Sequence, residues 1–343
     1  MESRMSESCI LLWSSHHHCS TLLLLFGRRA RKKEVKITIV RMNVARTRIR
    51  AIFTDMDRTL LNANHVISDY TKDVLRSIRR HNESTQNTKE KIYFILVTGR
   101  PYPDVIETVQ KTDGLVADYI VSNNGACIFD ASFRPIVQHC IPPTTVKTLL
   151  SLGVQFGRST DKNSFDFATS WFQGKGWYTN HKIEGLGRSY PPHFQPQLKL
   201  DTLCTPEQVQ ATVEENALEG IPQIFYYGPH ETLCPVEKEL DRLKDHVDFC
   251  FSLPFILDIS PHGINKGTAV SEVLSLLGLT PSESVAFGDG MNDLPMLQAV
   301  ATPCVMQNSM EALFAALPEA TVIGHHDEDG VAKKVVELFE IKL

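Results

Sequence analysis

Several features that would define other classes of protein are missing from this chain of 343 residues. No segment reaches the roughly 18 to 20 consecutive apolar residues that a membrane-spanning helix requires. The 8 cysteines are scattered and include no Cys-x-x-Cys pair, and a chain of this length needs no disulfides to hold a core together. We therefore expect a soluble intracellular protein with reduced thiols and without a membrane partner.

The chain also has little positive charge outside its first 50 residues. That segment contains 11 of the 35 basic and 3 of the 40 acidic residues, which leaves 24 basic and 37 acidic residues in the remainder. Because nucleic-acid phosphates require a basic surface, this acidic remainder argues against nucleic-acid binding. Small phosphorylated molecules stay compatible with it, since local positive groups and a metal ion can bind them.

The first 48 residues differ from everything that follows, and we interpret them as a non-core N-terminal extension. Their apolar runs precede the basic cluster Arg28–Lys33, and no small-residue cleavage site is evident, so they make a poor secretory signal. Two interpretations stay open: an organellar transit peptide, or an extension of the gene model with Met42 as the true start. The expected location is the cytoplasm, or an organelle if the segment is a genuine transit peptide.

From residue 49 onward, short apolar runs alternate with helical patterns, which predicts a doubly wound α/β fold with a parallel sheet. Near residue 131 the pattern changes to amphipathic strands and helices, typical of an inserted α+β domain. The alternation resumes at Ile256–Ile259 and ends with a helix over Gly330–Phe339. We therefore predict a core in two parts, 49–131 and 255–343, interrupted by a second domain over 132–254.

The most informative segment is the strand that ends in Thr54-Asp55-Met56-Asp57. Side chains alternate along a strand, so Asp55 and Asp57 share a direction while Met56 points away. Two neighbouring carboxylates suit Mg²⁺, and a carboxylate beside a divalent ion can attack phosphorus. Taken alone, the same pattern also fits a solvated Asp-x-Asp turn.

A second acidic segment, Gly288-Asp289-Gly290-Met291-Asn292-Asp293, also follows a predicted strand. Two glycines permit a tight turn, and Asp293 lies one helical turn after Asp289, so both carboxylates can face one point. Helix capping would use one of these acids and leave the other unexplained. The segment is therefore a plausible second half of a magnesium site.

Three further segments place polar groups where a strand ends or a helix begins. Thr98, Gly99 and Arg100 follow one strand, and the glycine allows backbone amides to approach an anion. The turn Ser122–Ala126 follows the next strand, and Lys266 begins a helix, where an ammonium group and the helix dipole can bind phosphate together. Each of these also has an ordinary structural interpretation as a cap, a turn or a solvated lysine.

Four segments together resemble the four motifs of the haloacid dehalogenase superfamily, in the order of that family: Asp55 to Thr59, Thr98, Lys266, and Gly288 to Asp293. The insertion resembles its C2 cap, and Ser122–Ala126 with Asp329–Ala332 is similar to the Cof-type phosphatase subfamily. The resemblance covers about residues 49–343. Arg58 departs from it, because most relatives carry glycine there, which affects the geometry of the turn.

The resemblance implies roles for individual residues. Asp55 is the expected nucleophile and Asp57 the general acid and base. The expected Mg²⁺ ligands are Asp55, the Met56 carbonyl, Asp289 and, through water, Asp293. Thr98, Gly99, Lys266 and Asn292 are expected to hold the phosphoryl oxygens, and further candidates for substrate contacts are Arg100, Asn123, Asn124 and Gly125. In the inserted domain, where aromatic residues more often serve packing, the candidates are Trp171, Trp177, Tyr178, His181 and Arg188.

The predicted function is Mg²⁺-dependent hydrolysis of phosphate monoesters of small metabolites, with sugar phosphates as the default substrates, through an aspartyl-phosphate. A phosphomutase and a catalytically silent phosphosugar-binding protein are the alternatives. The oligomeric state is not predicted. The run His325-His326-Asp327 invites a metal-site interpretation, but we interpret it as a solvated loop before the last helix.

Overall fold

The computed structural model describes residues 8–16, 19–29, 35–43, 48–112, 117–159, 165–181, 195–200 and 203–341. The chain divides into two compact units, residues 1–48 and 49–343. Within the described residues, no helix has both the length and the apolar character that a bilayer crossing requires.

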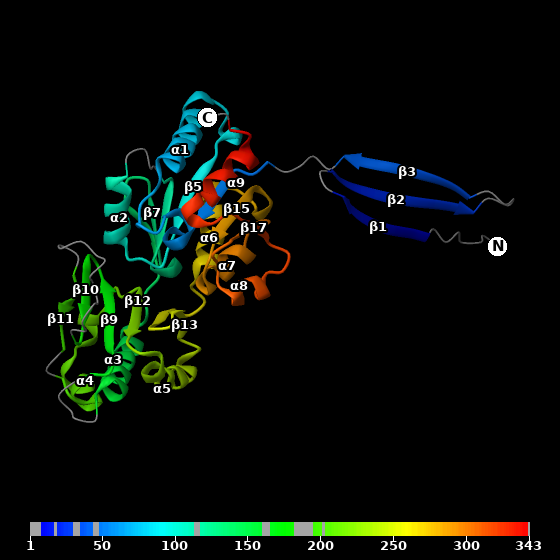
Figure 1. The fold of residues 1–343 in the computed structure, drawn as a ribbon. Helices are drawn as coiled ribbons and strands as arrows, with labels where there is room; N and C mark the ends of the chain where they lie inside the picture. The colour runs from blue at the N-terminus through cyan, green and yellow to red at the C-terminus, as the bar shows by residue number, and fades with distance from the viewer. Residues whose placement is uncertain are drawn as a thin grey trace. The chain divides into compact units, whose positions relative to one another are not determined.

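The first unit contains three strands, where the sequence analysis expected no part of the fold. They are β1 (Ser8–His16), β2 (Cys19–Arg29) and β3 (Val35–Asn43), and they form an antiparallel sheet in the order β1-β2-β3 (Figure 1). β-Branched and aromatic residues in this segment, such as Ile10, Phe26 and Ile37–Val40, favour extended structure, although its leucines do not. Whether the segment is a transit peptide stays a prediction.

An eight-stranded sheet forms the core of the second unit, in the order β17-β16-β15-β4-β5-β6-β7-β8. The first six strands of that order pair in parallel. After them, β7 pairs antiparallel with β6, and β8 pairs antiparallel with β7. The strands are β4 (Ala51–Thr54), β5 (Tyr93–Val97), β6 (Tyr119–Ser122), β7 (Cys127–Asp130), β8 (Pro135–Gln138), β15 (Ser284–Gly288), β16 (Thr302–Met306) and β17 (Thr321–Ile323).

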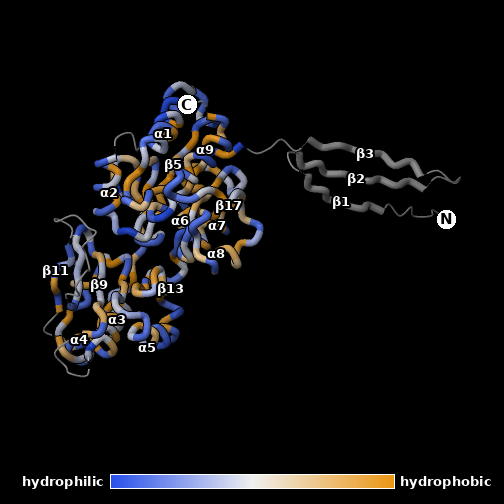
Figure 2. Tube along the Cα trace, in the orientation of Figure 1, coloured by the Kyte–Doolittle hydropathy of each residue, from blue (hydrophilic) through white to orange (hydrophobic). Residues whose placement is uncertain are grey.

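Helices cover both faces of this sheet, as predicted for a doubly wound fold. In the central strand β4, Ile52 packs into one apolar cluster while Ala51 and Phe53 pack into the other. The first cluster includes residues of α1 (Asp69–Ser84), α2 (Tyr102–Lys111) and α9 (Gly330–Phe339). The second includes residues of α6 (Lys266–Leu277), α7 (Leu294–Gln298) and α8 (Glu311–Ala316). Figure 2 shows hydrophobic residues recurring along these strands and helices.

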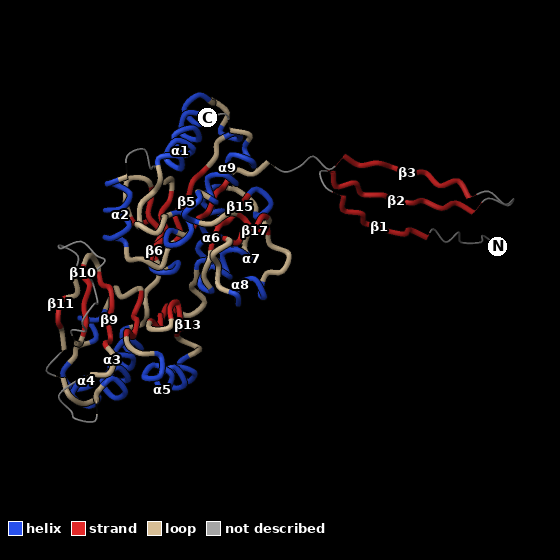
Figure 3. The backbone as a smooth tube through the Cα atoms, in the orientation of Figure 1, coloured by secondary structure: helices blue, strands red, loops and turns tan. Residues whose placement is uncertain are grey.

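A second sheet has the order β11-β10-β9-β12-β14-β13, and Figure 3 shows its strands apart from those of the core sheet. Its strands are β9 (Ala168–Gln173), β10 (Gly176–Thr179), β11 (Gln197–Leu198), β12 (Gln223–Tyr227), β13 (Val247–Leu253) and β14 (Ile256–Pro261). One face packs against α3 (Pro143–Gly157), α4 (Pro206–Thr212) and α5 (His230–Leu240). The inserted α+β domain is therefore present.

Two strands belong to a different sheet from the one that the sequence analysis assigned. Ile256–Ile259 was expected to return to the parallel core, but β14 pairs antiparallel with β12 and β13. Conversely, β8 lies in the expected insertion but pairs with β7 of the core sheet. The sequence of a short apolar strand does not specify which strand it pairs with. The hydrophobic pattern alone therefore could not assign β8 and β14 to the correct sheet.

Candidate active site

Asp55 and Asp57 leave the carboxyl end of β4, in the middle of the core sheet. The strand pairs with β15 on one side and β5 on the other, and the Asp55 amide continues the first pairing by donating to the Phe287 carbonyl (3.0 Å). Met56 is fully buried in the apolar core. The two acids lie in the turn after β4, which ends at Thr54. Met56 faces the apolar core, whereas both acids make ion pairs.

Lys266 brings two acidic segments together. The Asn265 side chain caps α6 by accepting from the Gly267 and Thr268 amides, which fixes the helix start where Lys266 lies. The Lys266 Nζ lies 2.6 Å from Asp55 Oδ1 and 2.6 Å from Asp293 Oδ1, and its side chain is fully buried. Burial by itself would lower the pKa of Lys266, but the two carboxylates outweigh it and raise the pKa above its ordinary value. The lysine is therefore held as a cation between them.

Asp289 and Asp293 complete this cluster from the turn after β15. Asp293 Oδ2 accepts from the Asp289 and Gly290 amides at 2.9 Å each, and Thr59 Oγ1 donates to Asp289 Oδ1 (3.0 Å). Gly288 is required here because a Cβ on it would lie 2.5 Å from the Asp293 Cβ. One carboxylate oxygen from each of Asp55, Asp289 and Asp293 lies within 4.8 Å of the others, and all three residues are buried.

The donor set fits a hard divalent cation. Among the described residues, the ion pairs of these carboxylates are with buried Lys266 and with Arg58, whose Nε lies 3.6 Å from Asp289 Oδ2. Burial and then the charge of Asp293 raise the pKa of Asp289 to about 7. Burial also raises the pKa of Asp55 well above its ordinary value, although Lys266 opposes the shift. All-oxygen ligands with uncompensated negative charge are the kind that Mg²⁺ prefers.

Asp57 is held separately, by Arg100. The guanidinium forms a two-point ion pair, with Nε 2.6 Å from Asp57 Oδ2 and Nη2 2.5 Å from Oδ1. Burial would raise the pKa of Asp57, but the hydrogen bonds and charge of Arg100 outweigh it and lower the pKa. Asp104 Oδ2 accepts from Arg100 Nη1 (2.9 Å) and so orients the arginine. Asp104 was not predicted from the sequence, although its position four residues after Arg100 is the spacing at which opposite charges pair on a helix.

The remaining predicted phosphate-site segments also meet. Thr98 is buried at the end of β5, and its carbonyl accepts from the Asn124 amide (3.1 Å). Asn292 Nδ2 donates to Asn124 Oδ1 (3.1 Å), and a Cβ on Gly99 would lie 2.9 Å from that same oxygen. Gly125 has φ +109° and packs against the Asn265 backbone, where α6 begins. The three loops thus form one packed group.

Asn123 connects the core to the inserted domain. Its Nδ2 donates to Gln223 Oε1 (3.0 Å), and Gln223 Nε2 donates to Asp258 Oδ1 (2.7 Å). Burial raises the pKa of Asp258. Neither Gln223 nor Asp258 was predicted from the sequence, although an acidic residue that interrupts the apolar run of β14 was a usable signal. The side chain of Asn123, a candidate substrate contact, is thus already engaged by the second sheet.

Aromatic residues of the inserted domain mostly pack within it. Trp171 and Trp177 are almost fully buried, in the two apolar clusters of the second sheet. Arg188, another candidate for substrate contact from the sequence, lies outside the described residues. A cavity of about 340 Å³ is lined by core residues such as Pro101 and Asn123 and by Phe172 and Lys175 of the second sheet.

A parallel sheet that presents paired aspartates, a buried lysine and a second acidic turn at its carboxyl edge, together with an inserted α+β domain, defines a haloacid dehalogenase-type phosphatase. The comparisons agree with this class. The chain belongs to the haloacid dehalogenase-like hydrolase family, whose sequence profile matches residues 52–335.

Individual relatives cover most of the chain. It is 28% identical over 280 residues to an HMP-PP phosphatase of Yersinia pseudotuberculosis serotype O:1b (strain IP 31758), covering 81% of this chain and 91% of the relative. A haloacid dehalogenase-like hydrolase from Bacteroides thetaiotaomicron has a similar structure, with a TM-score of 0.67, 23% identity and coverage of 85% of this chain and 100% of the other. A subclass IIB sugar phosphatase gives a TM-score of 0.65 with 21% identity over 85% of this chain and 100% of the other.

Proposed function

We propose that this chain is a Mg²⁺-dependent phosphatase that hydrolyses phosphate monoesters of small metabolites, sugar phosphates first among them, through an aspartyl-phosphate on Asp55. The observation that carries the proposal is the convergence of Asp55, Asp289 and Asp293, whose ligand oxygens lie within 4.8 Å of one another. Buried Lys266 contacts two of the three. Acids from both parts of the core thus surround one point, as a phosphoryl-transfer site requires.

Asp55 is the proposed nucleophile. A carboxylate oxygen forms a bond to phosphorus while the bond from phosphorus to the leaving oxygen breaks. Thr98, the Gly99 amide, Lys266 and Asn292 hold the phosphoryl oxygens, because stabilising charge is the protein's main contribution to this chemistry. A magnesium ion held by Asp55, the Met56 carbonyl, Asp289 and, through water, Asp293 would neutralise negative charge when bound. The Met56 carbonyl accepts from the Leu61 amide (2.8 Å), which leaves its second lone pair for a metal.

Asp57 is the proposed general acid and base. It donates a proton to the leaving oxygen, then takes one from the water that hydrolyses the aspartyl-phosphate. Arg100 orients the carboxylate for both steps through its two-point contact. Retention of both Asp55 and Asp57 disfavours a silent binding protein, because binding alone requires neither a nucleophile nor an acid.

The leaving group has a candidate location in the cavity of about 340 Å³. Its wall includes Pro101 and Asn123, which directly follow and precede the site residues Arg100 and Asn124, together with residues of the inserted domain. The relatives include an HMP-PP phosphatase and a fold neighbour that is a sugar phosphatase, so both kinds of phosphate belong in the substrate panel.

The test is a panel of phosphometabolites assayed with Mg²⁺ for released phosphate, with Asp55→Asn as the paired variant. We expect turnover in the unaltered chain and none in the variant, whose fold is checked by circular dichroism. Substantial activity in a folded Asp55→Asn protein would overturn the assignment. Isomerisation of hexose phosphates without phosphate release would favour the mutase. Failure to turn over even p-nitrophenyl phosphate would favour the binding protein.

A further inference from the structure

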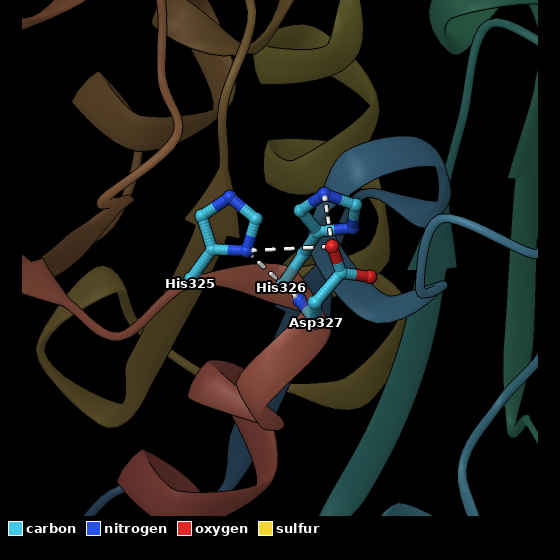
Figure 4. Close-up of side chains that lie close together, drawn as sticks. All are labelled: His325, His326 and Asp327. Carbon is cyan, nitrogen blue, oxygen red and sulfur yellow. Dashed lines mark hydrogen bonds and ion pairs between the residues drawn. The ribbon is translucent and has the colours of Figure 1, made fainter.

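The loop between β17 and α9 brings two histidines and an aspartate together, outside the residues proposed for hydrolysis. One ring nitrogen from each of His325 and His326 and one oxygen of Asp327 all lie within 4.8 Å of one another. In Figure 4 dashed lines join one carboxylate oxygen of Asp327 to a ring nitrogen of each histidine. The His326 side chain is only 9% exposed, so the interpretation as a solvated loop is wrong for this residue.

The spacing of these atoms is too long for hydrogen bonds and suits ligands of one ion. Asp327 Oδ2 lies 3.7 Å from His325 Nδ1 and 3.7 Å from His326 Nε2. Hydrogen bonds between nitrogen and oxygen span about 2.7 to 3.2 Å. Two ligands of a tetrahedral zinc ion with bonds of about 2.0 to 2.1 Å lie about 3.4 Å apart. The distance from Asp327 Oδ2 to each histidine nitrogen thus exceeds the ligand spacing of zinc by a few tenths of an ångström.

The protonation of His326 follows from its other contact. Its Nδ1 lies 2.9 Å from the Leu61 carbonyl, which only accepts, so Nδ1 carries the hydrogen. In the neutral ring, Nε2 then presents a lone pair toward the Asp327 carboxylate. The neutral ring and the carboxylate repel each other unless a cation lies between them, and either a metal ion or a second ring proton can be that cation. A backbone carbonyl on the far ring nitrogen is also the arrangement that orients metal-ligating histidines.

Asp327 is oriented in the same way. Its second oxygen, Oδ1, accepts from the Ala63 amide (2.7 Å), which leaves Oδ2 for the cluster. His325 Nδ1 accepts weakly from the Asp327 amide (3.2 Å), and this is the contact that a metal would replace. The loop after β4 therefore holds two of the three donors in place.

We propose that His325, His326 and Asp327 form a second metal site, which binds a zinc-type divalent transition metal with water in the fourth position. Two imidazoles and one carboxylate suit zinc, whereas Mg²⁺ prefers a set made of oxygen ligands. The exposed side of the cluster provides an entry path. Since Leu61 and Ala63 contact two of the ligands, the bound ion fixes the loop after β4 against the turn before α9.

The test is zinc binding by the full chain, measured by equilibrium dialysis and metal analysis in a large excess of Mg²⁺, which occupies the oxygen-rich site. The variants are His326→Gln and Asp327→Asn, which keep polar groups able to contact Leu61 and Ala63. We expect each to bind one zinc fewer per chain, or to bind that zinc at least about 10-fold more weakly. Cysteines and other histidines that bind zinc contribute equally to all the proteins and cancel in the comparison.

His262→Gln is the control, because His262 likewise faces a carboxylate, but at the hydrogen-bond distance of 3.1 Å from Asp248. It should leave zinc binding unchanged. Equal zinc stoichiometry and affinity in the unaltered chain and in both cluster variants would overturn the proposal, as would an equal loss in the control. If a variant does not fold, histidine ring signals of the unaltered chain decide by NMR: one equivalent of zinc must shift two imidazoles, and a shift of fewer overturns the site.

Discussion

Arg58 occupies the position where the resemblance led us to expect glycine, and the structure shows what an arginine requires there. Its φ is +55°, in the left-handed region that glycine adopts readily and in which other residues are strained. Two contacts with Asn308 hold it there, one from Arg58 Nη2 to the Asn308 carbonyl (2.9 Å) and one from Asn308 Nδ2 to the Arg58 carbonyl (2.8 Å). The guanidinium is thereby fixed beside Asp289, where it competes with a metal cation.

Replacement of Arg58 by glycine should therefore strengthen Mg²⁺ binding. We expect the Mg²⁺ concentration for half-maximal activity to fall about 3- to 10-fold, because one positive charge 3.6 Å from a ligand carboxylate is removed. Stability should change by less than about 1 kcal/mol, since relief of the left-handed strain offsets the lost hydrogen bonds. Magnesium titrations of activity at fixed ionic strength measure the effect. Unchanged magnesium dependence would show that Arg58 does not act on the metal site.

Arg100 should set the pH range over which Asp57 acts as an acid. It lowers the pKa of Asp57, so Arg100→Met should raise that pKa and move the alkaline limb of the kcat/KM profile to higher pH. The maximum rate should fall as well, because the carboxylate loses its orientation. A fall in rate with no movement of the limb would mean that Arg100 has only a structural role.

The ion pair between Arg100 and Asp57 should also make the stability of the fold depend on pH. Because the folded pKa of Asp57 is depressed, the stabilisation from Arg100 is present above the unfolded value of about 3.9 and is lost as pH falls through the folded value. The difference in unfolding free energy between the unaltered chain and Arg100→Met should therefore shrink as pH falls below about 4. Urea unfolding at several pH values measures it.

At the scale of elements, the turn around Gly125 holds the start of α6, and hence Lys266, in place. Gly125 combines φ +109° with a backbone neighbour that leaves no space: an added Cβ would lie 2.3 Å from the Asn265 carbonyl oxygen. Gly125→Ala should cost more than about 2 kcal/mol of unfolding free energy and reduce kcat. Gly174→Ala is the control, because Gly174 also has positive φ (+56°) but no atom within 4 Å of the added Cβ. An equal cost in both variants would contradict the packing argument.

The elements also show what local sequence could predict. The helices over Lys266–Leu277 and Gly330–Phe339 agree with the pattern, and Asn265 and Gly278 at the ends of the first are ordinary capping residues. The proximity of Asp55 and Asp289 could be predicted from the sequence, because both residues follow strands of one parallel sheet. The partner of β14 could not, since pairing depends on distant residues. Neither could the contact from Asn123 to Gln223, which joins residues 100 positions apart.

At the scale of the whole second unit, the acidic cluster makes stability depend on pH and on metal together. Asp289 has a folded pKa of about 7, above the unfolded value near 3.9, so the folded state holds its proton longer than the unfolded state does. In the absence of divalent ions, the protonated Asp289 stabilises the folded state at low pH, and this stabilisation is lost as the pH rises. The free energy of unfolding should therefore fall between about pH 4 and pH 7, by a few kcal/mol. A bound divalent ion stabilises the ionised carboxylate and should remove that fall.

We therefore expect thermal unfolding midpoints in EDTA to decrease between pH 5 and pH 8 by several degrees more than midpoints in saturating Mg²⁺. The comparison is made at equal ionic strength, with K⁺ replacing Mg²⁺, so that general screening of charge cancels. Asp289→Asn is the matched variant, because it removes the titrating group while keeping an oxygen that can accept from Thr59. Its midpoint should depend little on Mg²⁺ at either pH. If the two pH profiles of the unaltered chain run parallel, Asp289 does not couple a divalent ion to folding, and the metal site needs a different set of ligands.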